Sequence, residues 1–344
     1  MFLSDFESVE PTFIVPQSSG LNWLAEAHAR RSSEISTERF QKLLERYGCD
    51  EDKIAKRGTF LRDFTHKDWD SMSIFGEEGA SLETRMSFFN EALMPAVERL
   101  YRARTPDFKT WIHVTCTGYV SPSVVQIQTS AREWGDRVEC LHAYHMGCYA
   151  AMPAIRMARG LGETEILHTE LCTLHLDPSL HDPEQLVIQS LFADGVIRYR
   201  AGEKVPEHGF KVEDMRENIA PASLKHMTWG LARSQFTMTL AREVPKSVEA
   251  AIGAIVKPWQ TPRTVYAIHP GGPRIIDAVK EALGLSEEQV HFSREVLHEH
   301  GNMSSATLPH VWQKMLAQIP RGTPVISMAF GPGLTVSTSL MEKR

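Results

Sequence analysis

One cysteine stands where a reactive thiol would be placed, in the stretch AYHMGCYAAMPAIRMARG at residues 143–160. Cys148 follows Gly147 and precedes an alanine-rich segment that favours a helix. If the helix begins near this point, its free backbone N–H groups and its dipole favour a thiolate and a developing oxyanion. Pro153 places the regular start of the helix only a few residues earlier, or bends the helix there. A buried structural cysteine is the alternative, because that is the common fate of a free thiol.

Two further polar residues stand at turns in the second half of the chain. His269 ends the apolar run TVYAI and precedes PGGP at residues 270–273, a stiff turn that permits close backbone contact. Asn302 follows Gly301 in EHGNMSSA, where a helix N-cap is the alternative role. A thiolate, an imidazole and an amide together suit acyl transfer. The cysteine forms a thioester, and the other two donate hydrogen bonds to a carbonyl that becomes enolate-like.

The composition limits the class of protein that carries these residues. The 344 residues are 42% hydrophobic and 23% charged, which is ordinary globular composition with room for a large core. The net charge of −6 is unlike the basic field of a nucleic-acid-binding protein. No run approaches the roughly 18 apolar residues that a membrane span needs. We therefore expect neither a nucleic-acid partner nor a membrane partner.

The cysteine count favours reduced thiols in the cytoplasm. The five cysteines are an odd number and form no C-x-x-C pair, so neither a disulfide framework nor a metal site is expected. The N-terminal stretch MFLSDFESVEP is acidic and does not resemble a signal peptide.

Strand and helix patterns alternate along the chain, which predicts a layered α/β architecture. Helices are predicted at residues 36–47, 82–103 and 182–195, before residue 264, and after the turns at His269 and Asn302; strands are predicted at residues 111–116, 164–172, 196–200, 264–268, 323–330 and 334–341. Residues 1–20 look irregular, and the polar, turn-rich residues 201–219 mark a boundary. Each side of that boundary repeats the order strand, turn with a reactive residue, helix. We expect residues 1–200 to form a half that carries the cysteine, and residues 201–344 a duplicated half that carries the histidine and asparagine.

In its motifs the chain resembles the type III polyketide synthases, the chalcone-synthase-like branch of the thiolase superfamily. The matching stretches are MGCYA at 146–150, SLFADG at 190–195, HPGGPRI at 269–275, EHGNMSSA at 299–306 and FGPGLT at 330–335. The similarity is collinear from about residue 36 to the end, and the separation of His269 from Asn302 matches the family. The β-ketoacyl synthase III enzymes share the three residue types but surround them with different motifs.

The resemblance implies a thiolase-like five-layer αβαβα fold made of two duplicated halves, and a homodimer. It implies that Cys148 takes the starter acyl group from an acyl-CoA, while His269 and Asn302 bind the thioester carbonyl of malonyl-CoA. The pair would stabilise the enolate left by decarboxylation, which attacks the Cys148 thioester. His269 would also hold the Cys148 thiolate as an ion pair. The resemblance implies no bound cofactor, because the coenzyme A thioesters are substrates.

The resemblance also assigns the walls of the reaction cavity. Phe192 matches a gatekeeper phenylalanine between the coenzyme A tunnel and the cavity. The second gatekeeper position falls on Met238, with Phe236 as the alternative in a shifted register. Gly331 and Pro332 belong to AFGPG, which matches the loop that shapes the cyclisation cavity.

Basic residues for the phosphates of coenzyme A are expected on an early helix. Arg39 and Lys42 in RFQK match that place, and their separation of three puts them near one helix face. A solvated helix face is the alternative.

The sequence departs from the plant enzymes in the regions that select substrate and product. The segment from Cys148 to His269 is shorter, with the missing material at residues 200–235, and the loop CTGYVSPS differs from the plant C-T-T-S-G pattern. The starter, the number of extensions and the ring type therefore stay open.

Three other functions remain open from the sequence. A single-round ketosynthase like β-ketoacyl synthase III would join one extender, delivered on coenzyme A or an acyl carrier protein, without iteration or cyclisation. A papain-like cysteine hydrolase also has cysteine, histidine and asparagine in this order, but its local cysteine signature is absent. A catalytically silent binding protein is disfavoured because all three residues are present.

Overall fold

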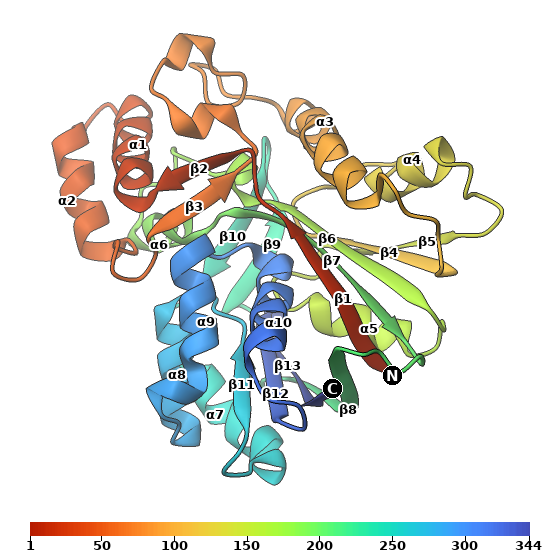
Figure 1. Ribbon diagram of the computed structural model, residues 1–344. Coiled ribbons are helices and arrows are strands. Elements are labelled where there is room, and N and C mark those ends of the chain that lie inside the picture. Colours follow the sequence, from red (N-terminus) through yellow and green to blue (C-terminus); the bar gives the residue numbers. More distant parts are fainter.

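A nine-stranded sheet forms the centre of the computed structural model, which describes residues 1–344 (Figure 1). Its strand order is β11-β12-β13-β8-β1-β7-β6-β4-β5. In chain order these strands are β1 (Phe2–Val9), β4 (Thr110–Thr115), β5 (Glu139–Tyr144), β6 (Thr164–Leu171), β7 (Asp194–Gly202), β8 (Gly209–Ile219), β11 (Val265–Ile268), β12 (Pro324–Gly331) and β13 (Thr335–Lys343). Two small sheets pair β2 (Phe13–Pro16) with β3 (Lys56–Thr59), and β9 (Met227–Leu231) with β10 (Phe236–Leu240).

The first strand joins the two parts of the large sheet. β1 pairs antiparallel with β7 on one side and with β8 on the other. Parallel pairs occur in both parts, β4 with β5 and β6 in one and β11 with β12 in the other. The predicted α/β class is confirmed, and the division into halves at residue 200 stays a prediction.

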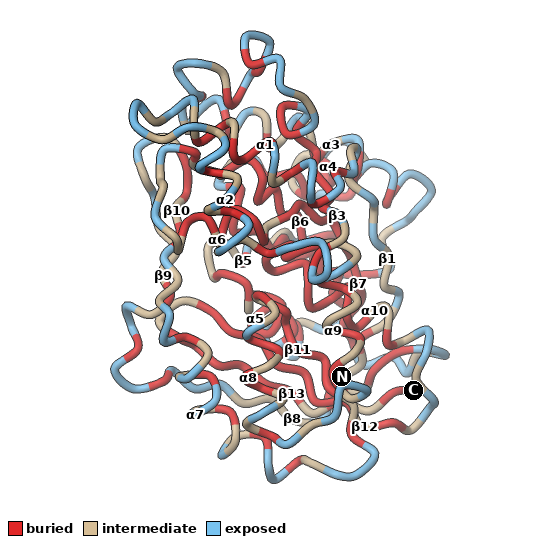
Figure 2. Tube along the Cα trace, turned by 90° about the vertical axis from the view of Figure 1, so that its left-hand side faces the viewer, coloured by how far each residue is buried: buried red, intermediate tan, exposed pale blue.

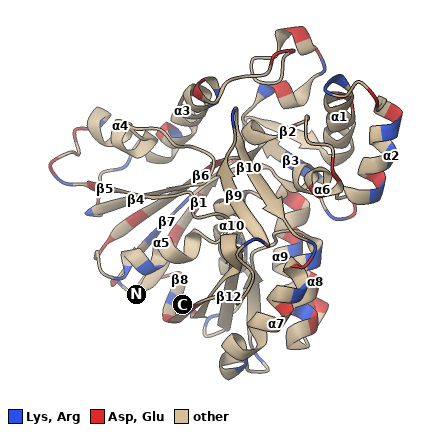
Figure 3. Ribbon diagram, turned by 180° about the vertical axis from the view of Figure 1, so that it is seen from behind, with Lys and Arg blue, Asp and Glu red and all other residues tan.

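Helices cover both faces of the sheet. They are α1 (Gln17–Arg30), α2 (Thr37–Tyr47), α3 (Leu82–Tyr101), α4 (Val124–Ala131), α5 (Ala151–Ala158), α6 (Pro183–Leu191), α7 (Val244–Val256), α8 (Pro273–Leu283), α9 (Glu287–His300) and α10 (Thr307–Gln318). Helix α5 contacts β4, β7 and β13, and α10 contacts β1, β7 and β11, so each of these two helices touches both parts of the sheet. Charged side chains gather instead on peripheral helices such as α2 and α8 (Figure 3). None of the helices is long and apolar enough to cross a membrane.

The buried core explains why the central strands lack alternation. Every residue of β4, β6 and β7 is buried, as expected for strands with helices or other strands on both faces (Figure 2). Small side chains form the buried face at the start of α5. Ala150, the N-cap residue, and Ala151 and Ala154 within the helix are fully buried. Their size allows the helix to approach the strands closely, which accounts for the alanine-rich stretch.

Several predicted elements are confirmed within one or two residues. Helix α2 begins at Thr37, and the side chain of Ser36 accepts a hydrogen bond from the Arg39 backbone as the predicted cap. The helix at α3, the strands at β4 and β6, and the two C-terminal strands also lie where the pattern places them.

Other predicted elements are wrong. Residues 1–20 are not irregular, because they form β1, β2 and the start of α1. Residues 209–219 are strand β8 rather than a turn-rich boundary; the strand pairs with β13 along its length, while many of its polar side chains reach solvent. Residues 227–240 form the β9–β10 hairpin within a segment that appeared helical.

Helix α6 also ends earlier than predicted. Its last helical residue is Leu191 rather than Gly195, and Phe192 already has extended backbone, with φ −78° and ψ 142°. Phe192 forms a parallel bridge with Asn302, and the chain then enters β7. Pairing with a distant segment, which no local pattern reveals, therefore sets the end of this helix.

Candidate active site

Cys148 lies in the turn between β5 and α5, three residues before the first helical residue. Gly147 has φ +85°, and a Cβ atom there would lie 2.5 Å from Cδ of Pro332. Glycine at this position therefore allows the AFGPG loop to pack directly against the turn that carries the thiol.

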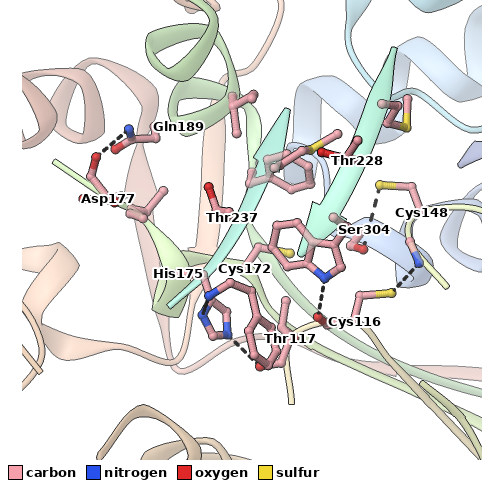
Figure 4. A pocket seen from close by; sticks show the side chains of 18 of the residues that line it. Cys116, Thr117, Cys148, Cys172, His175, Asp177, Gln189, Thr228, Thr237 and Ser304 are labelled. Atoms are coloured by element: carbon pink, nitrogen blue, oxygen red, sulfur yellow. Dashed lines mark hydrogen bonds between the residues drawn. The ribbon is translucent and has the colours of Figure 1, made fainter. Parts of the chain in front are cut away.

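The thiol of Cys148 is buried, and Cys148 lines two adjoining cavities of about 670 and 390 Å³. Figure 4 shows the larger of them. Its Sγ atom lies 3.8 Å from Oγ of Ser304. Burial raises the pKa of Cys148 to about 12, although hydrogen bonds from Ser304 and Asn302 act in the opposite direction. The sulfur is therefore protonated at neutral pH in this structure.

His269 follows β11 and presents an imidazole with no hydrogen-bond partner. Its backbone N–H donates to the carbonyl of Met328 at 2.8 Å, which extends the pairing of β11 with β12. Both ring nitrogens are buried and unpartnered, and burial lowers the pKa of His269 to about 3. A neutral imidazole offers one donor and one acceptor, so the ring is free to bind a carbonyl or to take a proton.

These pKa shifts differ from the ion pair expected between Cys148 and His269. Burial disfavours the charged form of both groups, so the structure holds a neutral thiol beside a neutral imidazole. Formation of the nucleophile then requires proton transfer, for which His269 provides an unoccupied acceptor.

Asn302 is fixed from both sides by the end of α6. Its backbone N–H donates to the carbonyl of Leu191 at 2.9 Å, and its own carbonyl accepts from the N–H of Ala193 at 2.9 Å. The side-chain Oδ1 accepts from the backbone N–H of Ser304 at 2.9 Å, but the N-caps of the next two helical segments are Met303 and Ala306, so the alternative N-cap role of Asn302 is wrong. The side-chain nitrogen donates to the carbonyl of Gly271 at 3.4 Å, and Asn302 lines the same cavity as Cys148.

The smaller cavity brings the three predicted reactive residues together. Cys148, His269 and Asn302 all line it, although they come from separate parts of the chain. Phe192 and Met238 line this cavity and also the larger one, as expected for side chains between two compartments.

Of the other residues predicted to form the cavity wall, two line the larger cavity and one lies outside both cavities. Phe236 lines only the larger cavity, where its ring stacks on His175 with centroids 4.5 Å apart. Pro332 also lines the larger cavity. Gly331 lines neither cavity, because it packs against the ring of Tyr149.

A third hollow of about 1720 Å³ adjoins the smaller cavity, with which it shares Leu191, Leu240, Gly271 and Ile275. Its lining includes four basic residues, Arg46, Lys53, Arg242 and Arg274, and three acidic ones, Asp50, Glu184 and Asp277. The two predicted basic residues, Arg39 and Lys42, are exposed on α2 but do not line this hollow. Arg46 lies one helical turn beyond Lys42, and that i, i+4 spacing was the sequence signal for it.

A buried carboxyl group behind the thiol was not anticipated from the sequence. Burial raises the pKa of Glu170 to about 7, although hydrogen bonds from Ser305, Cys116 and Thr117 act in the opposite direction. The Cys116 thiol accepts a hydrogen bond from the backbone of Gly147 at 3.0 Å. A glutamate inside the apolar strand pattern of residues 164–172 was the available signal.

The structure holds no disulfide and no metal-like cluster. All five cysteines are free. No group of three or more histidine, cysteine, aspartate or glutamate residues is arranged to hold a metal ion.

Comparisons with known proteins agree with the fold. Residues 212–343 match the family model of chalcone and stilbene synthases, C-terminal domain. PKS-I from the brown alga Ectocarpus siliculosus superposes with a TM-score of 0.87 at 23% identity, covering 100% of this chain and 98% of that one. The C-terminal type III polyketide synthase domain of Steely1 from Dictyostelium gives 0.85 at 22%, covering 99% and 98%. The 1,3,6,8-tetrahydroxynaphthalene synthase of Streptomyces coelicolor gives 0.84 at 20%, covering 99% of each.

The similarity to chalcone and stilbene synthases is at the level of family sequence for residues 212–343. Over its whole length the chain has the thiolase-like mixed α/β fold of solved type III polyketide synthases. The predicted resemblance and enzyme class are thereby confirmed.

Proposed function

We propose that the protein catalyses decarboxylative Claisen condensation of malonyl-CoA onto a starter acyl group held as a thioester on Cys148. The observation that carries this proposal is the convergence of Cys148, His269 and Asn302 on one apolar cavity. Both nitrogens of His269 are unpartnered, and Asn302 lines the same cavity as the thiol. Two donors beside a nucleophile are what an enolate intermediate requires.

The proposed reaction has two steps, acyl loading and condensation. In the first step, the Cys148 thiol gives its proton to His269 and its sulfur attacks the acyl-CoA carbonyl. The bond between the acyl carbon and the coenzyme A sulfur breaks, and the departing thiolate takes the proton from His269 and leaves as the coenzyme A thiol. In the second step, malonyl-CoA loses carbon dioxide while His269 and Asn302 hydrogen-bond its thioester oxygen. The resulting carbanion attacks the Cys148 thioester, so that the C–S bond breaks as the new C–C bond forms.

The three compartments have separate roles in this proposal. The hollow lined by Arg46, Lys53, Arg242 and Arg274 holds the phosphates of the coenzyme A substrates, because guanidinium and ammonium groups pair well with phosphate. The larger cavity of about 670 Å³ receives the growing chain. Phe192 and Met238 separate the two sides, and Pro332 shapes the chain-binding wall.

A single-round ketosynthase is the second candidate. It is supported by the small volume of the cavity around the three residues, about 390 Å³. It differs in its product, because one extension gives a lone β-keto thioester or acid and no ring.

The deciding experiment incubates the protein with a panel of acyl-CoA starters and malonyl-CoA, followed by mass spectrometry of the products. Products with two or more added ketide units support the polyketide synthase. A Cys148→Gln variant should lose elongation and retain malonyl-CoA decarboxylation, because the amide resembles an acylated cysteine. Absence of both Cys148 acylation and decarboxylation across the whole panel would sink the proposal. A homodimer and a cytoplasmic location stay predictions.

A further inference from the structure

We propose that Arg57 is a positioning residue that fixes the gatekeeper Phe192 and the amide of Asn302 relative to each other; this inference rests on the function proposed above. Arg57 lies in β3, which contacts both α9 and β7. Its side chain is fully buried, touches neither substrate cavity and is not part of the reactive set. Burial of a guanidinium costs free energy unless hydrogen bonds compensate for the lost water.

The guanidinium of Arg57 binds the end of α6. Its Nη1 donates to the carbonyl of Gln189 at 2.8 Å and to the carbonyl of Phe192 at 3.1 Å. The other two nitrogens have no partner, and the group packs over the ring of Phe64 at 4.9 Å. All of its hydrogen bonds are therefore directed at one helix terminus.

The last turn of α6 shows what these bonds achieve. The carbonyls of Gln189 and Phe192 are bound by Arg57, that of Ser190 by the side chain of Gln17, and that of Leu191 by the backbone of Asn302. The terminal carbonyls that a helix leaves free are thus all satisfied by other segments. The positive charge also lies at the negative end of the helix dipole, which favours arginine at this point.

The aliphatic part of Arg57 meets the residue before Asn302. Gly301 has φ +75°, and a Cβ atom there would lie 3.1 Å from Cγ of Arg57 and 3.0 Å from the carbonyl oxygen of Leu191. The guanidinium of Arg57 therefore binds the carbonyl of Phe192, and the aliphatic part of the same side chain packs against Gly301, the residue before Asn302. Removal of the guanidinium frees the carbonyls of Gln189 and Phe192 and leaves the packing of the aliphatic part against Gly301 in place.

The test separates two partial reactions in variants of the full chain. Arg57→Met removes the donors and keeps the stem, and Arg57→Lys restores one donor. Gln17→Met is the matched control, because Gln17 is also fully buried and caps the same turn without contacting Phe192 or Gly301. Decarboxylation of malonyl-CoA reports on Asn302, and acylation of Cys148 by acetyl-CoA, followed by intact mass, reports on the thiol.

We expect Arg57→Met to lower decarboxylation by about 30-fold or more while acylation changes by less than about threefold, with Arg57→Lys between the two. The control should change both rates alike. Hydrogen exchange of peptides covering residues 187–196 and 299–305 should quicken in the Arg57 variants beyond the control. Equal loss of both reactions, or exchange no faster than in the control, would overturn the inference. If the wild-type protein performs neither reaction, the proposed function fails, and hydrogen exchange alone still decides the role of Arg57; if Arg57→Met does not fold, Arg57→Lys carries both measurements.

Discussion

The Cys148 thiol donates a hydrogen bond to the hydroxyl oxygen of Ser304, with a distance of 3.8 Å between Sγ and Oγ. Ser304 adopts φ +50°, a left-handed backbone conformation that a residue with a side chain rarely takes. Such a conformation costs about 1–3 kcal/mol and persists where the surroundings hold it in place. Here the Asn302 side chain accepts a hydrogen bond from the Ser304 backbone N–H, so the strained turn presents its hydroxyl to the Cys148 thiol.

The ionisation of Cys148 predicts how its reactivity depends on pH. Because burial raises the pKa of Cys148 to about 12, the thiolate fraction rises about tenfold per pH unit below that value. Alkylation by iodoacetamide should therefore accelerate continuously from pH 7 to pH 10, with the Cys148→Ala variant as the background from the other thiols. A rate that is constant across pH 7 to 9 would instead indicate the ion pair with His269 that the sequence suggested.

Removal of the Ser304 hydroxyl should make the thiol less reactive. The hydrogen bond from Ser304 lowers the pKa of Cys148, so Ser304→Ala raises that pKa further. We expect alkylation at pH 8 to slow by about two- to fivefold, in line with the modest net strength of one hydrogen bond. Ser339→Ala is the control, because its hydroxyl is also buried, lies in β13 and has no hydrogen-bond partner. Faster alkylation in the Ser304 variant would contradict this account.

The pattern of agreement between sequence and structure has a physical cause. The three reactive residues were recognisable because each stands at a turn whose glycines and motif letters are local features. The ends of α6 and β8 were not recognisable, because they depend on pairing of Phe192 with Asn302 and of β8 with β13. The ionisation states of Cys148 and His269 could not be predicted from the sequence either, because a pKa depends on burial and therefore on the complete fold.

The buried histidines predict a loss of stability in mild acid. Burial lowers to about 3 the pKa values of six side chains: His28, His113, His168, His175, His269 and His310. The unfolded chain, with histidine pKa values near 6.5, binds more protons, so stability is present above about pH 6.5 and is lost as pH falls toward 3. The buried carboxyls Glu165, Glu170 and Asp194, with raised pKa values, act in the opposite direction but are fewer.

Urea unfolding at pH 7.5, 6.0 and 5.0 checks this expectation. The free energy of unfolding should fall at each step, and the fall should be smaller in His28→Gln, which removes one of the six groups. His208→Gln, at an exposed position, is the matched control and should follow the wild-type curve. A free energy of unfolding that is constant or rises between pH 7.5 and 5.0 would show that the carboxyls dominate.

The basic hollow predicts which arginines bind the coenzyme A substrates. Arg46→Gln and Arg274→Gln should each raise the KM for malonyl-CoA by about tenfold, since a charge-assisted hydrogen bond contributes about 1.5 kcal/mol. Arg39→Gln, on the same helix as Arg46 but outside the hollow, should leave KM within about twofold. The difference should shrink at high salt, because partly exposed charges are screened. A larger effect at Arg39 than at Arg46 would restore the assignment made from the sequence.

The position of Met238 between the two cavities predicts that this residue selects the size of the starter acyl group. It lines both cavities, and its backbone is held by the side chain of Gln185, which donates to the Met238 carbonyl at 2.7 Å. A rigid ring at this position narrows the passage, whereas the flexible methionine adapts to different acyl chains. Met238→Phe should therefore raise the KM for long-chain acyl-CoA starters by about tenfold or more and change that for acetyl-CoA by less than about twofold. Thr239→Val, on the adjacent residue outside both cavities, is the control. Equal effects on short and long starters would show that Met238 supports the wall without selecting the substrate.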